Sequence, residues 1–184
     1  MLRFGFAILY TALVFGANAA AADVAVADAL REGDMKKLNF LTEAKPMPDV
    51  ALLGMDEAPR SLAEFKGKWV VLNLWATWCP PCRTEMPGLD RLQAELGSDS
   101  FEVVTVATGR NSVTGIEKFF TEAGVVNLTA LRDPTSDLAH SIGVMGLPVT
   151  LILNPDGAEV GRLMGDAEWD SENARAVLTA LMAK

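Results

Sequence analysis

The run Trp-Val-Val-Leu-Asn-Leu-Trp at residues 69–75 restricts the possible folds of this chain more than any other segment. It is too continuously apolar for a strand with one face in water, and it is typical of a central strand covered on both faces. Four apolar residues follow at the spacing of an amphipathic helix that Gly97 would end: Met86, Leu89, Leu92 and Leu96. Because a further strand is predicted at 101–107, this order requires a parallel crossover. The sequence therefore predicts an α/β fold.

The pattern extends this fold on both sides. A capping box at Thr114 and Glu117 predicts a helix that ends before Gly124. Asp133 would cap a brief helix that runs to Ile142. The other predicted elements are a hairpin at 50–62, a short strand at 128–131, a hairpin at 149–164 with an Asn-Pro-Asp-Gly turn, and a closing helix at 174–182.

The N-terminus has the features of an export segment. A positive charge, an apolar run of about a dozen residues and a small-residue site predict a signal peptide at 1–19. The alternative is an uncleaved membrane anchor that extends to about residue 22. A leader with a marginal helix is expected at 20–45, and a proline-rich stretch then marks the start of the predicted domain, 46–184.

Length and charge limit the classes of partner. The chain has 184 residues, which suits a single domain, and a formal net charge of −8. A basic footprint for nucleic acid or an anionic membrane surface is missing from this composition. We therefore expect no nucleic-acid partner, and we expect a monomer.

Cys79 and Cys82 are the two cysteines of the chain, and three uses of the pair compete. A structural staple would stabilise the fold little, because the closed loop is so short. A tetrahedral zinc site needs four ligands, whereas the chain offers one histidine, His140, and no second cysteine pair. Copper held by two thiolates stays open. A redox centre fits best, because a helix start stabilises the Cys79 thiolate. We therefore expect no resident metal or cofactor.

In the redox interpretation, Cys79 attacks a substrate disulfide and Cys82 then displaces the reduced substrate. Pro80 and Pro81 lack N–H groups, so two donors that could stabilise the Cys79 thiolate are missing. We therefore expect a reducing rather than a strongly oxidising protein. Glu85 shares a helix face with Cys82, which makes it the candidate proton carrier when Cys82 attacks or leaves.

The stretch Trp-Ala-Thr-Trp-Cys-Pro-Pro-Cys-Arg-Thr-Glu-Met-Pro at 75–87 resembles the active-site signature of the TlpA/ResA/CcmG family of thioredoxin-like thiol:disulfide oxidoreductases. Within that family, the residues at 73–78 and Gly-Asp-Ala-Glu-Trp at 165–169 are most similar to the TlpA subgroup. The resemblance implies a thioredoxin fold, in which helices flank a central mixed β-sheet. It also implies an N-terminal β-hairpin and a helical insertion at 114–142.

The resemblance further implies how substrates bind. Pro148 would be a cis proline facing the disulfide, and the backbone of Leu147 would pair with an extended substrate segment. Trp78, next to the nucleophile, is expected to contact partners together with Pro80 and Pro81.

The resemblance to the TlpA subgroup implies a periplasmic reductant of protein disulfides in the assembly of cytochrome oxidase copper sites. The implied substrates are a copper chaperone and the copper-site subunit of the oxidase, and the implied electron donor is a membrane thiol reductant of the CcdA/DsbD type. One alternative is a reductase of apocytochrome c in cytochrome c maturation. Another, from a different class, is a non-enzymatic copper carrier with Cys79 and Cys82 as ligands.

Other residues have more ordinary interpretations. His140, on a short polar helix, is expected at the surface, and the eight methionines are dispersed as core-filling residues usually are. Trp69 and Trp169 are expected to serve packing. Asn73 stands where thioredoxin itself carries a buried aspartate, and this departure directs attention to Glu85.

Overall fold

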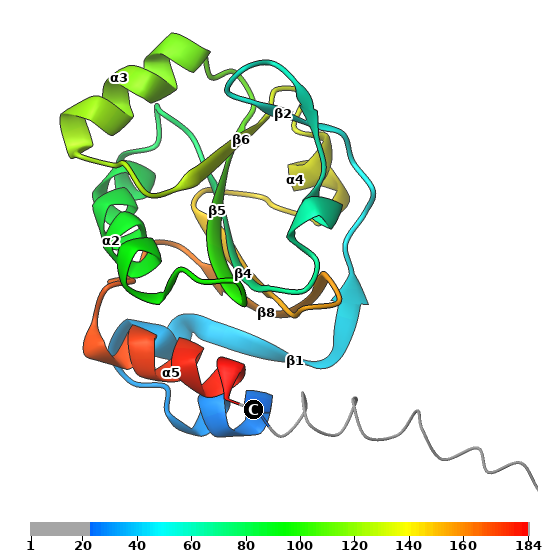
Figure 1. The fold of residues 1–184 in the computed structure, drawn as a ribbon, viewed down its shortest axis with the longest axis vertical. Helices are drawn as coiled ribbons and strands as arrows, with labels where there is room; N and C mark the ends of the chain where they lie inside the picture. Colours follow the sequence, from blue (N-terminus) through cyan, green and yellow to red (C-terminus); the bar gives the residue numbers. More distant parts are fainter. Residues whose placement is uncertain (1–22, 184) are drawn as a thin grey trace, which may run out of the picture.

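The computed structural model describes residues 23–183, which form one eight-stranded mixed sheet flanked by helices (Figure 1). The strand order is β1-β8-β7-β4-β5-β6-β2-β3. The elements are, in chain order, η1 (Gly33–Lys37), β1 (Leu38–Pro46), β2 (Leu52–Gly54), β3 (Pro59–Arg60), η2 (Leu62–Phe65), β4 (Trp69–Trp75), α2 (Pro80–Leu96), β5 (Phe101–Thr108), α3 (Val113–Ala123), β6 (Thr129–Asp133), α4 (Asp137–Ser141), β7 (Val149–Leu153), β8 (Ala158–Met164) and α5 (Glu172–Met182). The predicted signal peptide or anchor lies outside the described residues.

β4 lies at the centre of the sheet, as its sequence predicts. Every residue of β4 is buried, and the strand pairs in parallel with β5 and antiparallel with β7. The β7–β8 and β2–β3 hairpins also form, and the second extends the edge of the sheet beside β6. The expected fold class is therefore confirmed, with α3, β6 and α4 inserted between β5 and β7. Within residues 23–183, no helix is long and apolar enough to cross a bilayer.

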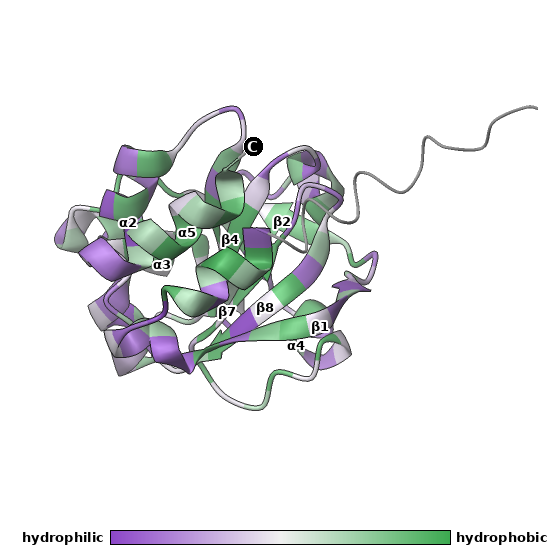
Figure 2. Ribbon diagram, turned by 90° about the horizontal axis from the view of Figure 1, so that it is seen from below, coloured by the Kyte–Doolittle hydropathy of each residue, from purple (hydrophilic) through white to green (hydrophobic). Residues whose placement is uncertain are grey.

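Alternate residues of β4 face two different apolar cores. Val71 and Trp75 belong to the core beneath α2, α3 and α5, whereas Leu72 and Leu74 belong to the core beneath α4 and η2. Figure 1 shows α2 and α3 on one side of β5 and α4 on the other. Hydrophobic residues concentrate in the central strands, and hydrophilic residues gather at the periphery (Figure 2). By this alternation Asn73 points toward the α2 side, so a polar group enters the first core.

The segment before residue 46 belongs to the domain, so the predicted boundary at that residue is wrong. Residues 23–29 are helical, η1 follows, and β1 pairs with β8 as far as Pro46. Met35 and Leu38 are fully buried in the core. The sequence predicts only a marginal helix here, because three short elements follow one another and no single hydrophobic period persists. The strand also lies at the sheet edge, where proline is tolerated.

Two predicted helix starts are displaced. α3 begins at Val113, because the Ser112 hydroxyl accepts a hydrogen bond from the Gly115 N–H at 3.1 Å and caps the helix. The capping box predicted at Thr114 therefore does not form the start. α4 begins later than predicted, and the Asp133 carboxylate accepts two N–H groups of this helix, at 2.9 and 3.1 Å.

Replacing Met35 with alanine is expected to lower the free energy of unfolding by about 2 kcal/mol, because a buried side chain of η1 is lost and a cavity remains. Val26→Ala is the matched control in the same N-terminal segment, since Val26 is 56% exposed, and it should change stability by less than about 0.5 kcal/mol. Urea unfolding of both variants measures the difference. Equal effects would contradict the assignment of η1 to the core.

Candidate active site

The two cysteines lie where β4 leads into α2. Cys79 is the N-cap of α2 and Cys82 lies in its first turn, and their disulfide has an S–S distance of 2.04 Å and a Cα–Cα distance of 5.4 Å. Pro80 and Pro81 occupy the first helical positions, where a missing N–H is tolerated. The amide of Cys82 donates to the Cys79 sulfur at 3.4 Å. The helix start predicted for the cysteine pair is confirmed.

The two sulfur-bearing residues differ in their access to solvent. Cys79 retains 4% of its exposure, whereas Cys82 is fully buried, so the first contact with a substrate falls to Cys79. The neighbouring Trp78 is 64% exposed, and Pro80 and Pro81 are exposed as well. An apolar rim therefore lies open to solvent beside the disulfide.

A cis peptide bond joins Leu147 and Pro148, as the resemblance implies. The register pairs Leu74 with Val149, which brings Pro148 to the end of the sheet where β4 leads toward Cys79. Leu147 is half-buried and packs against both apolar cores. The structure thus brings these residues to the same end of the sheet as the disulfide, and their role in substrate binding stays a prediction.

Glu85 lies inside the domain, one helical turn beyond Cys82. The residue is 4% exposed. Its carboxylate accepts hydrogen bonds from Asn73 Nδ2 at 2.8 Å, from the Ala167 N–H at 3.2 Å and from Trp169 Nε1 at 2.9 Å. A carboxylate that accepts three N–H groups in a buried site is held in one orientation.

Burial raises the pKa of Glu85 from 4.5 to about 7, because a poorly solvated site disfavours the charged form. The three N–H donors oppose this rise by stabilising the carboxylate, and the nearby Asp166 carboxylate adds to it. A carboxyl group with a pKa close to the working pH can both accept and release a proton. The environment therefore suits the predicted proton carrier.

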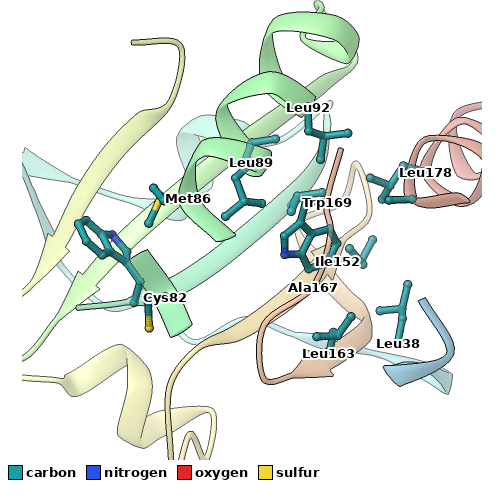
Figure 3. Close-up of a cluster of buried hydrophobic side chains, with 14 of the residues drawn as sticks. Leu38, Cys82, Met86, Leu89, Leu92, Ile152, Leu163, Ala167, Trp169 and Leu178 are labelled. Atoms are coloured by element: carbon teal, nitrogen blue, oxygen red, sulfur yellow. The ribbon is translucent and has the colours of Figure 1, made fainter. Parts of the chain in front are cut away.

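Trp169 does more than the packing expected from the sequence. Its ring lies within the apolar cluster, with Leu92 of α2 and Leu178 of α5 nearby (Figure 3), and the residue is fully buried. Its indole N–H nevertheless serves the Glu85 carboxylate. Sequence reasoning identifies the stretch at 165–169 through its resemblance, but it contains no signal that links this stretch to Glu85.

Asn73, which stands where thioredoxin carries a buried aspartate, is the second partner whose contact with Glu85 sequence reasoning does not predict. Its amide donates to the Thr150 hydroxyl at 2.9 Å as well as to Glu85, and its Oδ1 has no hydrogen-bond partner among the described residues. With its amide turned over, Asn73 can accept a hydrogen bond from protonated Glu85. One side chain can therefore serve both protonation states of the carboxyl group. The detectable signal is an asparagine within an otherwise apolar buried strand.

The turn between β4 and α2 is fixed by contacts of two residues that precede Trp78. The ring of Trp75 stacks on Phe120, with ring centroids 5.5 Å apart. The Asn111 side-chain oxygen accepts the Thr77 N–H at 2.8 Å. The rigid turn orients the cysteine pair at the end of the sheet.

Two residues for which the sequence predicts no catalytic role occupy ordinary positions. His140 is exposed on α4, and Trp69 is buried in the core, as predicted for both. In the part of the chain that the structure describes, no cluster of three or more His, Cys, Asp and Glu side chains is arranged to hold a metal ion.

Comparison with known proteins agrees with this geometry. The family model described as AhpC/TSA matches residues 44–158. Thiol-disulfide oxidoreductase ResA of Bacillus subtilis is 30% identical over 125 residues, which cover 68% of this chain and 69% of ResA.

Two solved structures are similar in fold and in sequence. A Chlorobium tepidum protein described as a thiol:disulfide interchange protein DsbE has a TM-score of 0.68 at 26% identity, covering 78% of this chain and 99% of that one. The exposed lipoprotein thioredoxin of Streptococcus pneumoniae has a TM-score of 0.60 at 28% identity, covering 74% and 100%. The chain therefore belongs to the AhpC/TSA family, and its cysteine pair makes it a thioredoxin-fold thiol-disulfide oxidoreductase of the ResA and DsbE type.

Proposed function

We propose that this protein reduces protein disulfides outside the cytoplasm during the assembly of cytochrome oxidase copper sites. The observation that carries the proposed reductase chemistry is the buried Glu85 beyond the buried Cys82 on α2. Because burial raises the pKa of Glu85 to about 7, the carboxylate can take the Cys82 proton at neutral pH. The spacer of two prolines supports reduction over oxidation, since it withholds two N–H donors from the Cys79 thiolate.

The reaction starts when the Cys79 thiolate attacks one sulfur of a substrate disulfide, and the other substrate sulfur leaves as a thiolate. Glu85 then accepts the proton of the Cys82 thiol, and the Cys82 thiolate attacks the Cys79 sulfur. The second substrate sulfur leaves and takes up a proton. Two electrons have passed from the cysteine pair to the substrate, and the pair ends as the disulfide.

The exposed rim suits a protein substrate better than a small thiol compound. Trp78 offers a large apolar contact with its ring open to solvent. The backbone of Leu147, before the cis Pro148, would pair with an extended segment of the substrate. Pro80 and Pro81 would line the approach to Cys79.

The proposed partners follow from the TlpA subgroup, which the residues at 73–78 and 165–169 resemble most. The first candidates are a copper chaperone and the copper-site subunit of the oxidase, and apocytochrome c is the second. A membrane thiol reductant of the CcdA/DsbD type would return the pair to the dithiol. The predicted export segment at 1–19 supports a periplasmic location, either free or tethered, and we expect the protein to act as a monomer.

Replacing Cys82 with serine tests the proposed function, because Cys79 still attacks and the mixed disulfide can no longer be resolved. Expressed in its native cells, the variant should accumulate covalent complexes through Cys79 that dissolve on adding a reductant. The double variant Cys79→Ser/Cys82→Ser is the matched control and should trap nothing. Recovery of copper chaperones or the oxidase subunit supports the proposal, and recovery of apocytochromes favours the second candidate. No complexes, together with stoichiometric Cu(I) retention by the wild type, would replace it with the copper carrier.

A further inference from the structure

The segment at 165–169 connects the cis proline before β7 with α2. Gly165 donates its N–H to the carbonyl of the cis Pro148 at 2.9 Å. Ala167 and Trp169 are buried, and both donate to Glu85. The next residue, Asp170, forms an ion pair with an α2 arginine at 2.7 Å. A shift of this segment would therefore move donors away from Glu85.

The outer side of the same segment is held by η1. Asp166 and Glu168 are exposed, in alternation with the buried residues that face Glu85. Lys37 Nζ donates to the Asp166 carbonyl at 3.0 Å, and the Asp34 carboxylate accepts the Glu168 N–H at 3.0 Å. These two side chains of η1 also form an ion pair at 2.8 Å. The segment is thus held between η1 outside and Glu85 inside.

We propose that Asp34 and Lys37 are positioning residues, which hold the 165–169 segment so that its two inward N–H groups stay on the Glu85 carboxylate. The proposal rests on the function proposed above for Glu85. Under this proposal the N-terminal segment contributes to the chemistry of α2. Its Asp34 lies 134 residues before Glu168 in the chain. Neither η1 residue touches the cysteines or the carboxyl group that would move the proton.

The charged groups around Glu85 allow two effects on its pKa to be distinguished. One is the loss of a nearby charge, and the other is a displacement of the N–H groups that donate to the carboxylate. Asp166 and Glu168 lie on the 165–169 segment, and Asp34 and Lys37 lie on η1, while β4 contributes the neutral Asn73. Through space alone, loss of Asp34 would lower the pKa of Glu85 or leave it unchanged, and loss of Lys37 would raise it. Loss of position predicts a rise in both variants, because two donors to the carboxylate weaken.

The test follows the Glu85 carboxyl carbon by ¹³C NMR from acid to alkaline pH in the full chain in its disulfide form, with the resonance assigned by its absence in Glu85→Gln. Asp34→Ala and Lys37→Ala should each raise the pKa of Glu85 by about half a unit or more, the effect of weakened hydrogen bonds to a charged group. Lys37→Arg keeps both donor functions and should restore the wild-type value. Asp28→Ala is the matched control, because it breaks a 2.6 Å ion pair with Arg31 on the same segment.

Opposite shifts of the Glu85 pKa in Asp34→Ala and Lys37→Ala, or no shift of this pKa in either variant, would overturn the positioning role. A shift in Asp28→Ala as large as that in Asp34→Ala would overturn it too, since general loosening of the N-terminal segment would then be the cause. The NMR readout does not depend on turnover. If the two η1 variants shift together while Glu85→Gln reduces disulfides at the wild-type rate, the positioning holds and the proposed role of Glu85 fails.

Discussion

Replacing Glu85 with glutamine is expected to slow the reduction of a protein disulfide by about 100-fold at neutral pH, the typical contribution of a positioned proton carrier. Glutamine has nearly the same shape, and its side-chain oxygen can still accept the Ala167 and Trp169 N–H groups. It cannot accept a proton from Cys82. The loss should therefore fall on the step in which Cys82 attacks the mixed disulfide.

Stopped-flow mixing of the reduced protein with an oxidised protein substrate separates the two steps. Attack by Cys79 should keep its rate in Glu85→Gln, and the mixed disulfide should accumulate because resolution is slow. The wild-type rate of resolution should rise with pH through about 7, where Glu85 loses its proton, and the variant should lack this rise. Glu95→Gln is the matched control, an exposed carboxylate on the same helix. Equal rates of resolution in Glu85→Gln and the wild type would remove Glu85 from the mechanism.

The fold elements around the disulfide were predictable because their signals are local. The apolar run of β4, the proline pair and the amphipathic spacing of α2 lie within one continuous stretch of about 30 residues, a length over which periodicity can be read directly. The two clear hairpins depend on short turns and are local in the same sense. The order of these elements then leaves few topologies.

The environment of Glu85 could not be predicted from such local sequence signals. Its three donors lie 12, 82 and 84 residues away in sequence, on β4 and on the segment after β8. The sequence pairs Glu85 with Cys82 through helical spacing, yet it contains no measure of burial at that site. Burial is what raises the pKa of Glu85 and turns an ordinary carboxylate into a candidate proton carrier.

Local sequence patterns fail to predict the N-terminal segment for a related reason. β1 is a mostly exposed edge strand whose partner, β8, lies more than one hundred residues further on, as the pair Leu38 and Leu163 shows. Such a strand lacks both the continuous apolar run of β4 and a clear alternation. The role of η1 in holding the 165–169 segment depends on that same distant pairing.

The wild-type protein is expected to lose about 3 kcal/mol of stability as the pH rises from about 4.5 to above 7, through Glu85 alone. In the unfolded chain the group titrates near its ordinary value, 4.5, whereas in the folded protein its pKa is about 7. Between these values the folded state binds one proton more than the unfolded state, so stability falls with rising pH. The lowered pKa values of Asp34, Glu64 and Asp170 act in the opposite direction, but at more acid pH.

Glu85→Gln should abolish this loss, because glutamine does not titrate. Urea unfolding of the disulfide form at about pH 5 and about pH 8 should therefore show the variant gaining on the wild type by about 2 to 3 kcal/mol between the two conditions. Glu95→Gln should follow the wild type at both. An identical pH dependence in Glu85→Gln and the wild type would mean that Glu85 keeps its ordinary pKa. Glu85 is thus expected to lower the stability of the folded protein at neutral pH, although its replacement slows catalysis. Both effects have the same cause, because the burial that destabilises the charged carboxylate also raises its pKa to the range in which it can accept the Cys82 proton.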